Sequence, residues 1–244
     1  MTKTSITFLL DRTGSMQRIL KGTISGFNAY LDVLKEDTGE LYFTLIQFDS
    51  VSTDIVYANL PIADVPHLSC ETYKPRGWTP LIEAAWRAIK AVEKSVAGTP
   101  AKVIVCIQTD GEENASGCDY TWQMLNDLIK EKTALGWQFN FMGASMDAYQ
   151  QAGRMGISAG STMSYDGQSG VATKEAFAGT ARNARSYASG QSAGTGYSTA
   201  QKAAAGDVYM GHRQAAQGAG GAGGGSAAPK KDIVDEIAIP KIPA

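Results

Sequence analysis

Apolar residues recur along the chain in two alternating patterns. Short runs rich in β-branched and aromatic residues predict strands, and longer segments with apolar residues three or four positions apart predict amphipathic helices. The predicted strands are residues 6–10, 41–48, 53–57, 102–108, 137–142 and 161–164. The predicted helices cover residues 17–34, 80–92, 120–133 and 147–154.

The alternation of strands and helices predicts an α/β fold with a doubly wound, mostly parallel sheet flanked by helices. Residues 102–108 are almost continuously apolar, which is typical of a strand buried on both faces of a parallel sheet. Residues 53–57 are expected to lie antiparallel to residues 41–48, because the two runs are joined by a short connection.

The composition changes after Asp166, and this change predicts the domain organisation. We expect a domain over residues 1–166, then a helical, low-complexity extension over 167–215 with a helix at 174–187, a flexible Gly/Ala linker at 216–228, and a tail at 229–244. This C-terminal extension is rich in Gly and Ala. Two interpretations of the tail stay open: disorder, or a docking peptide that pairs with a sheet edge or a partner groove. Its apolar residues are Ile233, Val234, Ile237, Ile239 and Ile242.

Charge and cysteine content exclude several classes of function. The 244 residues carry a formal net charge of −2, which gives no general attraction to nucleic acid or to an anionic membrane. No apolar run has the length of a membrane span or a secretory signal, so we expect a cytoplasmic protein. The three cysteines, Cys70, Cys106 and Cys118, have no CxxC spacing, which argues against a disulfide framework or a thiolate zinc site.

Candidate chemistry begins directly after the first predicted strand, in the stretch of residues 11–16. Asp11, Thr13 and Ser15 are hard oxygen donors at alternate positions, so in extended backbone they can converge on one point. Such donors suit Mg²⁺ or Mn²⁺. The same six residues are equally compatible with a turn in which Thr13 or Ser15 caps the following helix.

Two later positions complete a possible cation site. Thr79 precedes Pro80 at the start of the second helix, where it is the natural N-cap but could also direct its hydroxyl into a crevice above the sheet. Asp110 follows the buried strand 102–108. In an open parallel sheet, ligands bind beyond the carboxyl ends of the strands, where the strand order reverses.

The stretches DRTGSM, GWTPL and TDGEEN together resemble the metal-ion-dependent adhesion site of the von Willebrand factor A (vWA) domain family, over about the first two-thirds of the chain. Residues 136–164 also resemble small stand-alone bacterial and bacteriophage members. Thr13 stands where the family usually has Ser, which keeps the hydroxyl and adds a methyl group. The resemblance implies a Rossmann-like fold and one divalent cation, Mg²⁺ or Mn²⁺, surrounded by Asp11, Thr13, Ser15, Thr79 and Asp110.

The function implied by this resemblance is metal-dependent docking without catalysis. An Asp or Glu of a partner protein would replace a water on the cation, and the chain would act as an adaptor in an intracellular complex. A structural or assembly subunit of a viral particle or multiprotein complex is an alternative, favoured by the Gly/Ala-rich tail. A Mg²⁺-dependent phosphoesterase is less favoured, because His67 and His212 lie beside no motif and no nucleotide-binding or hydrolase motif is present.

Four further residues lie near these motifs. Asp49, Glu112 and Glu113 are expected to be ordinary solvated charges in loops; the alternative is that they lie at the rim of the site and tune metal affinity or repel the wrong acidic partner. Trp78 is interpreted either as an exposed interface anchor or as a core residue, and the sequence favours neither.

Overall fold

The computed structural model describes residues 2–37, 39–211 and 237–243, and these contain one six-stranded sheet. Its order is β3-β2-β1-β4-β5-β6, and only β3 is antiparallel to its neighbour. This confirms the predicted α/β fold with a mostly parallel sheet. The strands are β1 (Lys3–Asp11), β2 (Leu41–Phe48), β3 (Thr53–Pro61), β4 (Ala101–Thr109), β5 (Gln138–Ala144) and β6 (Thr162–Tyr165).

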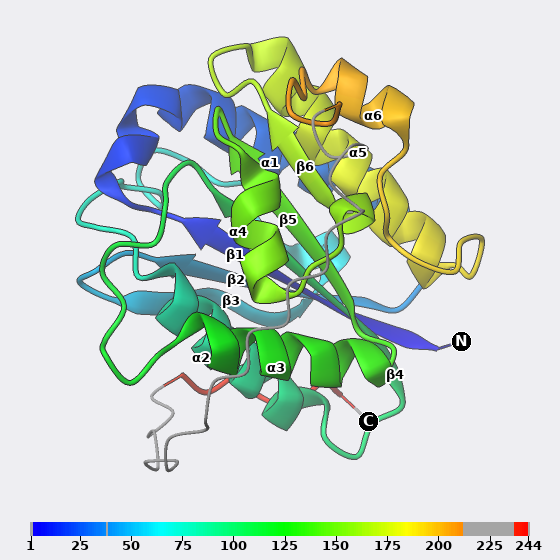
Figure 1. Ribbon diagram of the computed structural model, residues 1–244. Helices are drawn as coiled ribbons and strands as arrows, with labels where there is room; N and C mark the ends of the chain where they lie inside the picture. Colours follow the sequence, from blue (N-terminus) through cyan, green and yellow to red (C-terminus); the bar gives the residue numbers. More distant parts are fainter. Residues whose placement is uncertain (1, 38, 212–236, 244) are drawn as a thin grey trace.

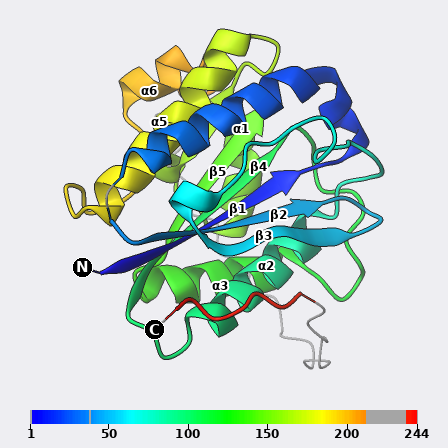
Figure 2. The same ribbon diagram turned by 180° about the vertical axis from the view of Figure 1, so that it is seen from behind.

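Helices cover both faces of the sheet (Figures 1 and 2). On one face α1 (Leu20–Lys35) lies beside α5 (Gly170–Ala188), with the short α6 (Thr199–Ala204) packed on α5. On the other face lie α2 (Leu81–Val96), α3 (Trp122–Ala134) and α4 (Ala148–Met155). Short 3₁₀ turns occur at η1 (Gly14–Ile19), η2 (Ile62–Asp64) and η3 (Ala159–Ser161). Among the described helices, none is both long and apolar enough to cross a membrane.

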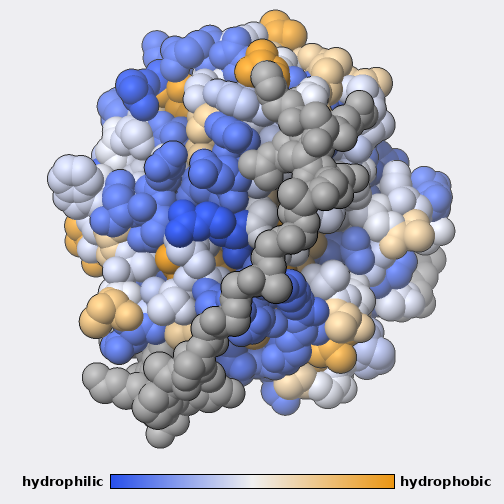
Figure 3. Space-filling view, viewed as in Figure 1, coloured by the Kyte–Doolittle hydropathy of each residue, from blue (hydrophilic) through white to orange (hydrophobic). Residues whose placement is uncertain are grey.

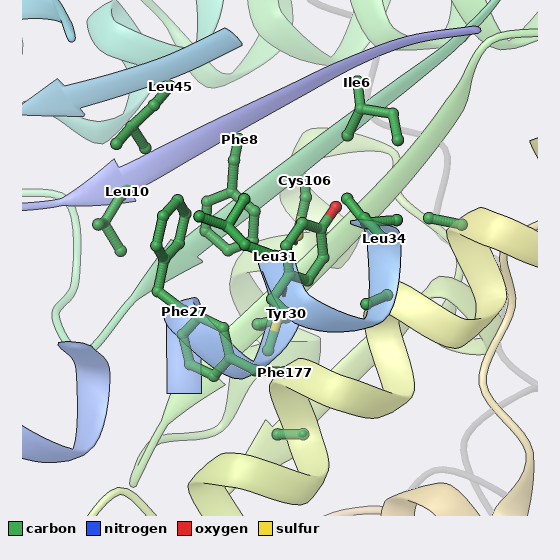
Figure 4. Close-up of a cluster of buried hydrophobic side chains, with 14 of the residues drawn as sticks. Ile6, Phe8, Leu10, Phe27, Tyr30, Leu31, Leu34, Leu45, Cys106 and Phe177 are labelled. Carbon is green, nitrogen blue, oxygen red and sulfur yellow. Dashed lines mark hydrogen bonds between the residues drawn. The ribbon is translucent and has the colours of Figure 1, made fainter. Parts of the chain in front are cut away.

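Strand β1 lies at the centre of the sheet and contributes to both cores. Because successive side chains of a strand point to opposite faces, Phe8 faces α1 and α5 while Leu9 faces α2. The ring of Phe8 packs edge-on against Phe27, at a centroid distance of 5.3 Å, and is stacked on Phe177 at 5.9 Å. Figure 4 shows these rings together between β1, α1 and α5. This aromatic contact fixes both helices on the sheet.

Helix α5 corrects the predicted domain organisation. The helix expected at 174–187 is present but longer, and it packs along α1 as part of the main core instead of forming an extension. Tyr197 and Ala205, in the segment that follows, are also buried in this core. The inner face of α5 is almost entirely Ala, Gly and Thr around Phe177, so its burial comes from close helix contact and not from high hydropathy. Residues 216–228, the predicted linker, lie outside the described residues.

The C-terminal segment, residues 237–243, lies alongside α2 (Figure 2, red). Ile237, Ile239 and Ile242 are buried, and the backbone N–H of Ile242 donates to the carbonyl of Ser95 at the end of α2. Of the two interpretations of the tail, docking therefore holds for this segment, and the site is on the chain itself. Ile233 and Val234 lie outside the described residues.

The close approach of α1 to α5 predicts a contrast between two glycines of α1. A Cβ at Gly26 would lie 2.7 Å from Cδ2 of Phe177, whereas a Cβ at Gly22 would meet no atom closer than 3.8 Å. Gly26→Ala should therefore lower the free energy of unfolding by about 1–3 kcal/mol. Gly22→Ala should be neutral, or stabilising by up to about 1 kcal/mol. Urea unfolding followed by circular dichroism measures both, and equal effects would contradict this packing.

Candidate metal centre

The carboxyl ends of β1 and β4 lie side by side and carry the two predicted acidic ligands. Asp11 is the last residue of β1, and Asp110 directly follows β4. The two strands pair in parallel, with Leu10 opposite Gln108. The chain leaves β1 toward β2 on one side, while β4 and β5 continue the sheet on the other. The strand order therefore reverses between β1 and β4, which is where open α/β sheets bind ligands.

A chain of hydrogen bonds joins the first three predicted ligands to the fifth. Asp11 Oδ1 accepts the backbone N–H of Thr13 at 2.6 Å, and the hydroxyls of Thr13 and Ser15 are 3.2 Å apart. The Ser15 hydroxyl in turn donates to Asp110 Oδ1. Thr13 precedes η1, but its side chain makes no capping hydrogen bond. Within this loop the hydroxyls therefore face one another and the second carboxylate, and Thr13 does not act as a cap.

Thr79 joins the same group from a third segment. Helix α2 begins at Leu81 and its N-cap residue is Pro80, so the prediction that Thr79 caps this helix is wrong. Instead, Asn114 holds the Thr79 backbone by a pair of bonds, in which Thr79 N–H donates to Asn114 Oδ1 at 2.8 Å and Asn114 N–H donates to the Thr79 carbonyl at 3.0 Å. The Thr79 hydroxyl is left to face the acidic loop.

Gly111 shows how closely the segments approach one another. A Cβ placed on Gly111 would lie 3.2 Å from Thr79 Oγ1 and 3.7 Å from Ser15 Oγ. Both hydroxyl oxygens therefore flank one point directly beside Asp110. All five predicted ligands, which are spread over 100 residues of sequence, meet at one edge of the sheet.

Burial makes the two carboxylates unfavourable as isolated charges. Asp11 is fully buried, and burial raises its pKa to about 7, although hydrogen bonds from Thr109 and Thr13 act in the opposite direction. Burial also raises the pKa of Asp110, against the effects of the Ser15 hydrogen bond and of Arg18. Arg18 lies 3.8 Å from Asp110 with a side chain 73% exposed, so it provides little compensation. A cation between the carboxylates would stabilise both charged forms.

The donor set fits a hard divalent cation. Two carboxylates and three hydroxyls offer only oxygen, which Mg²⁺ and Mn²⁺ prefer, and sulfur or imidazole ligands for zinc are absent from this set. Over the described part of the chain, no three His, Cys, Asp or Glu side chains gather in a way that could hold a metal. The candidate site depends on hydroxyls for most of its donors, and Gly111 leaves space beside them. The residues that would hold the cation are Asp11, Thr13, Ser15, Thr79 and Asp110.

Asp49 has a structural role that differs from the one expected from its position in a loop. Its side chain is buried and accepts hydrogen bonds from Arg12 Nε at 2.9 Å and Arg76 Nε at 2.8 Å. Burial alone would raise the pKa of Asp49, but bonds from Arg76 and from backbone N–H groups lower it below its usual value. The prediction of a solvated charge was wrong, because Asp49 anchors its loop to Arg12 and Arg76. Arg12 adjoins the first candidate ligands, and Arg76 lies in the segment that leads to Thr79.

Glu113 also proves to be a structural residue. Its carboxylate accepts the backbone N–H of Ile82 at 2.7 Å, in the first turn of α2, and those of Ala115 and Ser116 in its own loop. It therefore ties the loop after Asp110 to the start of α2, and the expectation of a solvated charge was wrong here as well. Glu112 is exposed, as expected.

Several supporting residues were not found by sequence reasoning. Tyr73 donates its hydroxyl to the Asp11 carbonyl at 2.5 Å, and Gln151 on α4 donates to the Gly111 carbonyl at 3.1 Å. Thr109 donates to Asp11 Oδ2. Thr109 adjoins a motif and could have been suspected. Tyr73 and Gln151 carry no local signal, because only the fold brings them to the site.

Histidine takes no part in the candidate site as far as the structure describes it. His67 hydrogen-bonds to Asp32 of α1 at 2.8 Å, on an exposed part of the surface. His212 lies outside the described residues.

No protein-family model matches the chain, and no curated protein sequence matches it. Solved structures do. A von Willebrand factor type A protein from Catenulispora acidiphila is 12% identical with a TM-score of 0.52, over 75% of this chain and 43% of that one. The pilus adhesin SpaC from Lactobacillus rhamnosus GG is 13% identical with a TM-score of 0.59, over 77% and 31%. The vWF domain of the type V pili tip protein Mfa5 from Porphyromonas gingivalis is 9% identical with a TM-score of 0.58, over 77% and 96%.

These likenesses define the class of fold. The chain spans less than half the length of the first two structures and matches nearly the whole of the third, which is a single domain. It has the Rossmann-like α/β fold of von Willebrand factor type A domains, as the resemblance of its motifs implied.

The raised pKa of Asp11 predicts how the metal-free protein responds to pH. Because the folded state retains this proton up to about pH 7 and the unfolded state loses it near 3.8, rising pH destabilises the fold between these values. Asp11→Asn removes the ionisation. Relative to this variant, the wild type should lose stability, by about 2–3 kcal/mol, as the pH rises from about 5 to about 8. Denaturant unfolding in chelator measures the difference.

Added Mg²⁺ provides the control for this pH experiment. At the higher pH, Mg²⁺ should restore stability to the wild type and leave Asp11→Asn unchanged, because only the wild type supplies the buried carboxylate. Parallel pH profiles of the two proteins in chelator would contradict the raised pKa. An equal Mg²⁺ effect on both would contradict the ligand role of Asp11.

Proposed function

We propose that this chain is a protein-interaction module that captures an Asp or Glu side chain of a partner protein through a divalent cation. The observation that carries the proposal is the meeting of two buried carboxylates and three hydroxyls where the strand order reverses. Two of the structures with this fold are a pilus adhesin and a domain of a pilus tip protein, which is consistent with a role in binding.

The charge balance explains how a partner would be recognised. Two carboxylates roughly neutralise a divalent cation, and Mg²⁺ usually keeps water at its remaining positions. A carboxylate from another protein can replace one of these waters and form a charge-assisted contact. We infer docking and not catalysis, because both carboxylates are candidate ligands of the cation and His67 lies on an exposed part of the surface, bonded to Asp32.

Trp78 supplies an apolar contact beside the candidate site. Its side chain is 69% exposed, so of the two interpretations of this residue the exposed one holds. The backbone is fixed, because Trp78 N–H donates to Ser50 Oγ at 2.9 Å and the preceding Gly77 has φ +69°, where a Cβ would lie 2.7 Å from the same oxygen. Val51, beside Ser50, is 67% exposed. An exposed tryptophan on a fixed backbone, next to Thr79, suits a partner whose acidic residue has an apolar neighbour.

The face of the molecule drawn in Figure 3 offers few broad apolar areas. On the face drawn in Figure 3, outside the grey atoms, hydrophilic residues predominate and apolar residues are scattered in small groups. Such scattering is ordinary for a protein surface. This supports local recognition at the cation over binding through a wide apolar face.

Metal titration tests whether the chain binds a divalent cation at the candidate site. The wild type should bind one Mn²⁺ or Mg²⁺ by calorimetry, and Asp11→Ala combined with Asp110→Ala should abolish binding. Gly111→Ala keeps every ligand but crowds Thr79 Oγ1, so its affinity should fall about tenfold. Gly117→Ala is a matched control in the same loop, since its Cβ would meet no atom closer than 3.5 Å. No binding by the wild type, or equal binding by the double variant, refutes the site.

Peptide selection tests whether the bound cation captures an acidic residue of a partner. Peptides selected from a random display library on the wild type in Mg²⁺ should be enriched in Asp or Glu and should be released by chelator. Selection on Trp78→Ser should retain the acidic enrichment but lose enrichment for apolar residues beside it, because the indole surface is gone. Peptides that ignore chelator, or that show no acidic preference, would rule out capture through the cation.

A further inference from the structure

The C-terminal segment packs against α2, β3 and the start of β1, on the opposite face of the sheet from α6, and we call the surface that it covers the groove. Ile237 and Ile239 join the apolar cluster of α2 and α3, and Ile242 is 3% exposed. The residues between them, Ala238, Pro240 and Lys241, are exposed. The segment therefore has the form of a short ligand with three apolar anchors.

The groove also supplies polar groups that match the segment. Lys3 Nζ donates to the Pro243 carbonyl at 2.7 Å, Asn59 Nδ2 donates to the Pro240 carbonyl, and the Ser95 carbonyl accepts the N–H of Ile242 at 3.2 Å. Proline has no N–H, so it cannot donate to a strand ladder. Residues 237–243 have no strand pairing in the described structure, and side chains of β1 and β3 recognise the two proline carbonyls instead.

Asn59 is held in a strained conformation at this contact. Its φ is +48°, in the left-handed region that costs energy for residues other than glycine, and it lies beside an irregularity in the pairing of β2 with β3. Thr44 fixes it, because Thr44 Oγ1 accepts Asn59 N–H at 3.0 Å and donates to Asn59 Oδ1 at 3.2 Å. The amide is thereby oriented with Nδ2 toward Pro240. Strain at a contact residue is common where a protein clamps a ligand.

The connection between domain and segment does not force the segment onto its own groove. Between Gly211 and Ile237 lie 25 residues, which can extend to at most about 85 Å. A domain of about 200 residues has a radius of gyration of only about 16 Å. A chain of this length can therefore reach either the groove of its own domain or that of a neighbouring copy.

We propose that this groove is a peptide-binding site whose ligand, residues 237–243, is separable from the domain and can come from a second copy of the chain. In one molecule the tether keeps the local concentration of the segment high, so self-docking predominates in dilute solution. Where copies are crowded, tail-to-groove exchange links them without using the cation site. Such linkage would support the assembly role considered from the sequence.

A peptide-binding experiment tests whether residues 237–243 can bind the groove as a separate ligand. The probe is a fluorescent peptide of residues 235–244, and the host is the full-length chain with Ile237, Ile239 and Ile242 changed to Asp, so that its groove is free. Anisotropy should show saturable binding, about tenfold or more tighter than to the wild type, whose own tail competes. The same peptide carrying Ile239→Asp should not bind. Equal binding to host and wild type, or no binding to a folded host, overturns the proposal.

Two further variants complete this test: one examines recognition by Asn59, and the other replaces the host if the triple variant is unfolded. Asn59→Gly in the host removes the amide donor while glycine tolerates the positive φ, so the fold should persist and peptide affinity should fall about tenfold. An unchanged affinity contradicts recognition by Asn59. If circular dichroism shows that the triple-Asp host is unfolded, a host with the single change Ile239→Ala replaces it, with the same expected direction.

A shortened connection tests exchange between copies. Deleting residues 214–232 leaves six residues between Gly211 and Ile237, which span at most about 20 Å, so we expect docking on the chain's own groove to become unfavourable. Light scattering should show a dimer or larger species that reverts to monomer when Ile239→Asp is added. A shortened chain that stays monomeric at all concentrations would contradict exchange.

Discussion

Two carboxylates lie at the ends of adjacent parallel strands, where Asp11 is fully buried and the side chain of Asp110 is only 5% exposed. A buried charge is expensive unless it is paired, and neither Asp11 nor Asp110 has a buried basic partner among the described contacts. Their environment supplies hydroxyls and backbone N–H groups instead, which orient oxygen donors without neutralising them. Such an arrangement favours a cation, and in the metal-free protein it costs stability.

The surrounding loops are organised to hold these donors in place. Asp49 clamps Arg12 and Arg76, which fixes the segment that contains the first three ligands against the one that leads to Thr79. Asn114 and Glu113 then join the loop after β4 to the start of α2. The site is therefore built from long-range contacts between loops, while the sheet below sets the positions of their ends.

Much of this arrangement could be predicted from the sequence. Apolar periodicity located every strand of the described sheet, and the three motifs located the five candidate ligands, because both signals are local. The length of α5 and its place in the core were not predicted, since its inner face of Ala, Gly and Thr has low hydropathy. That face is buried by close contact with α1 at Gly26. Asp49 and Glu113 were taken for solvated charges, because their partners lie tens of residues away. Thr79 was expected to cap α2, yet the helix begins two residues later.

The binding site of the C-terminal segment also could not be predicted from the sequence. Its isoleucines indicated some kind of docking, but the groove that receives them is assembled from β1, β3 and α2 and is invisible in any one stretch of sequence. The groove and the candidate metal centre use different residues, so binding at one does not require the other. If both proposals hold, a single domain has two separate means of contact with other proteins.

A crystal structure of the protein with Mn²⁺, in which the anomalous signal locates the metal, tests the candidate metal centre directly. We predict one strong peak between Ser15, Thr79 and Asp110, with direct oxygen ligands at about 2.0–2.2 Å and Asp11 bound directly or through water. A peak elsewhere, or empty density at this point in crystals saturated with Mn²⁺, would contradict this prediction.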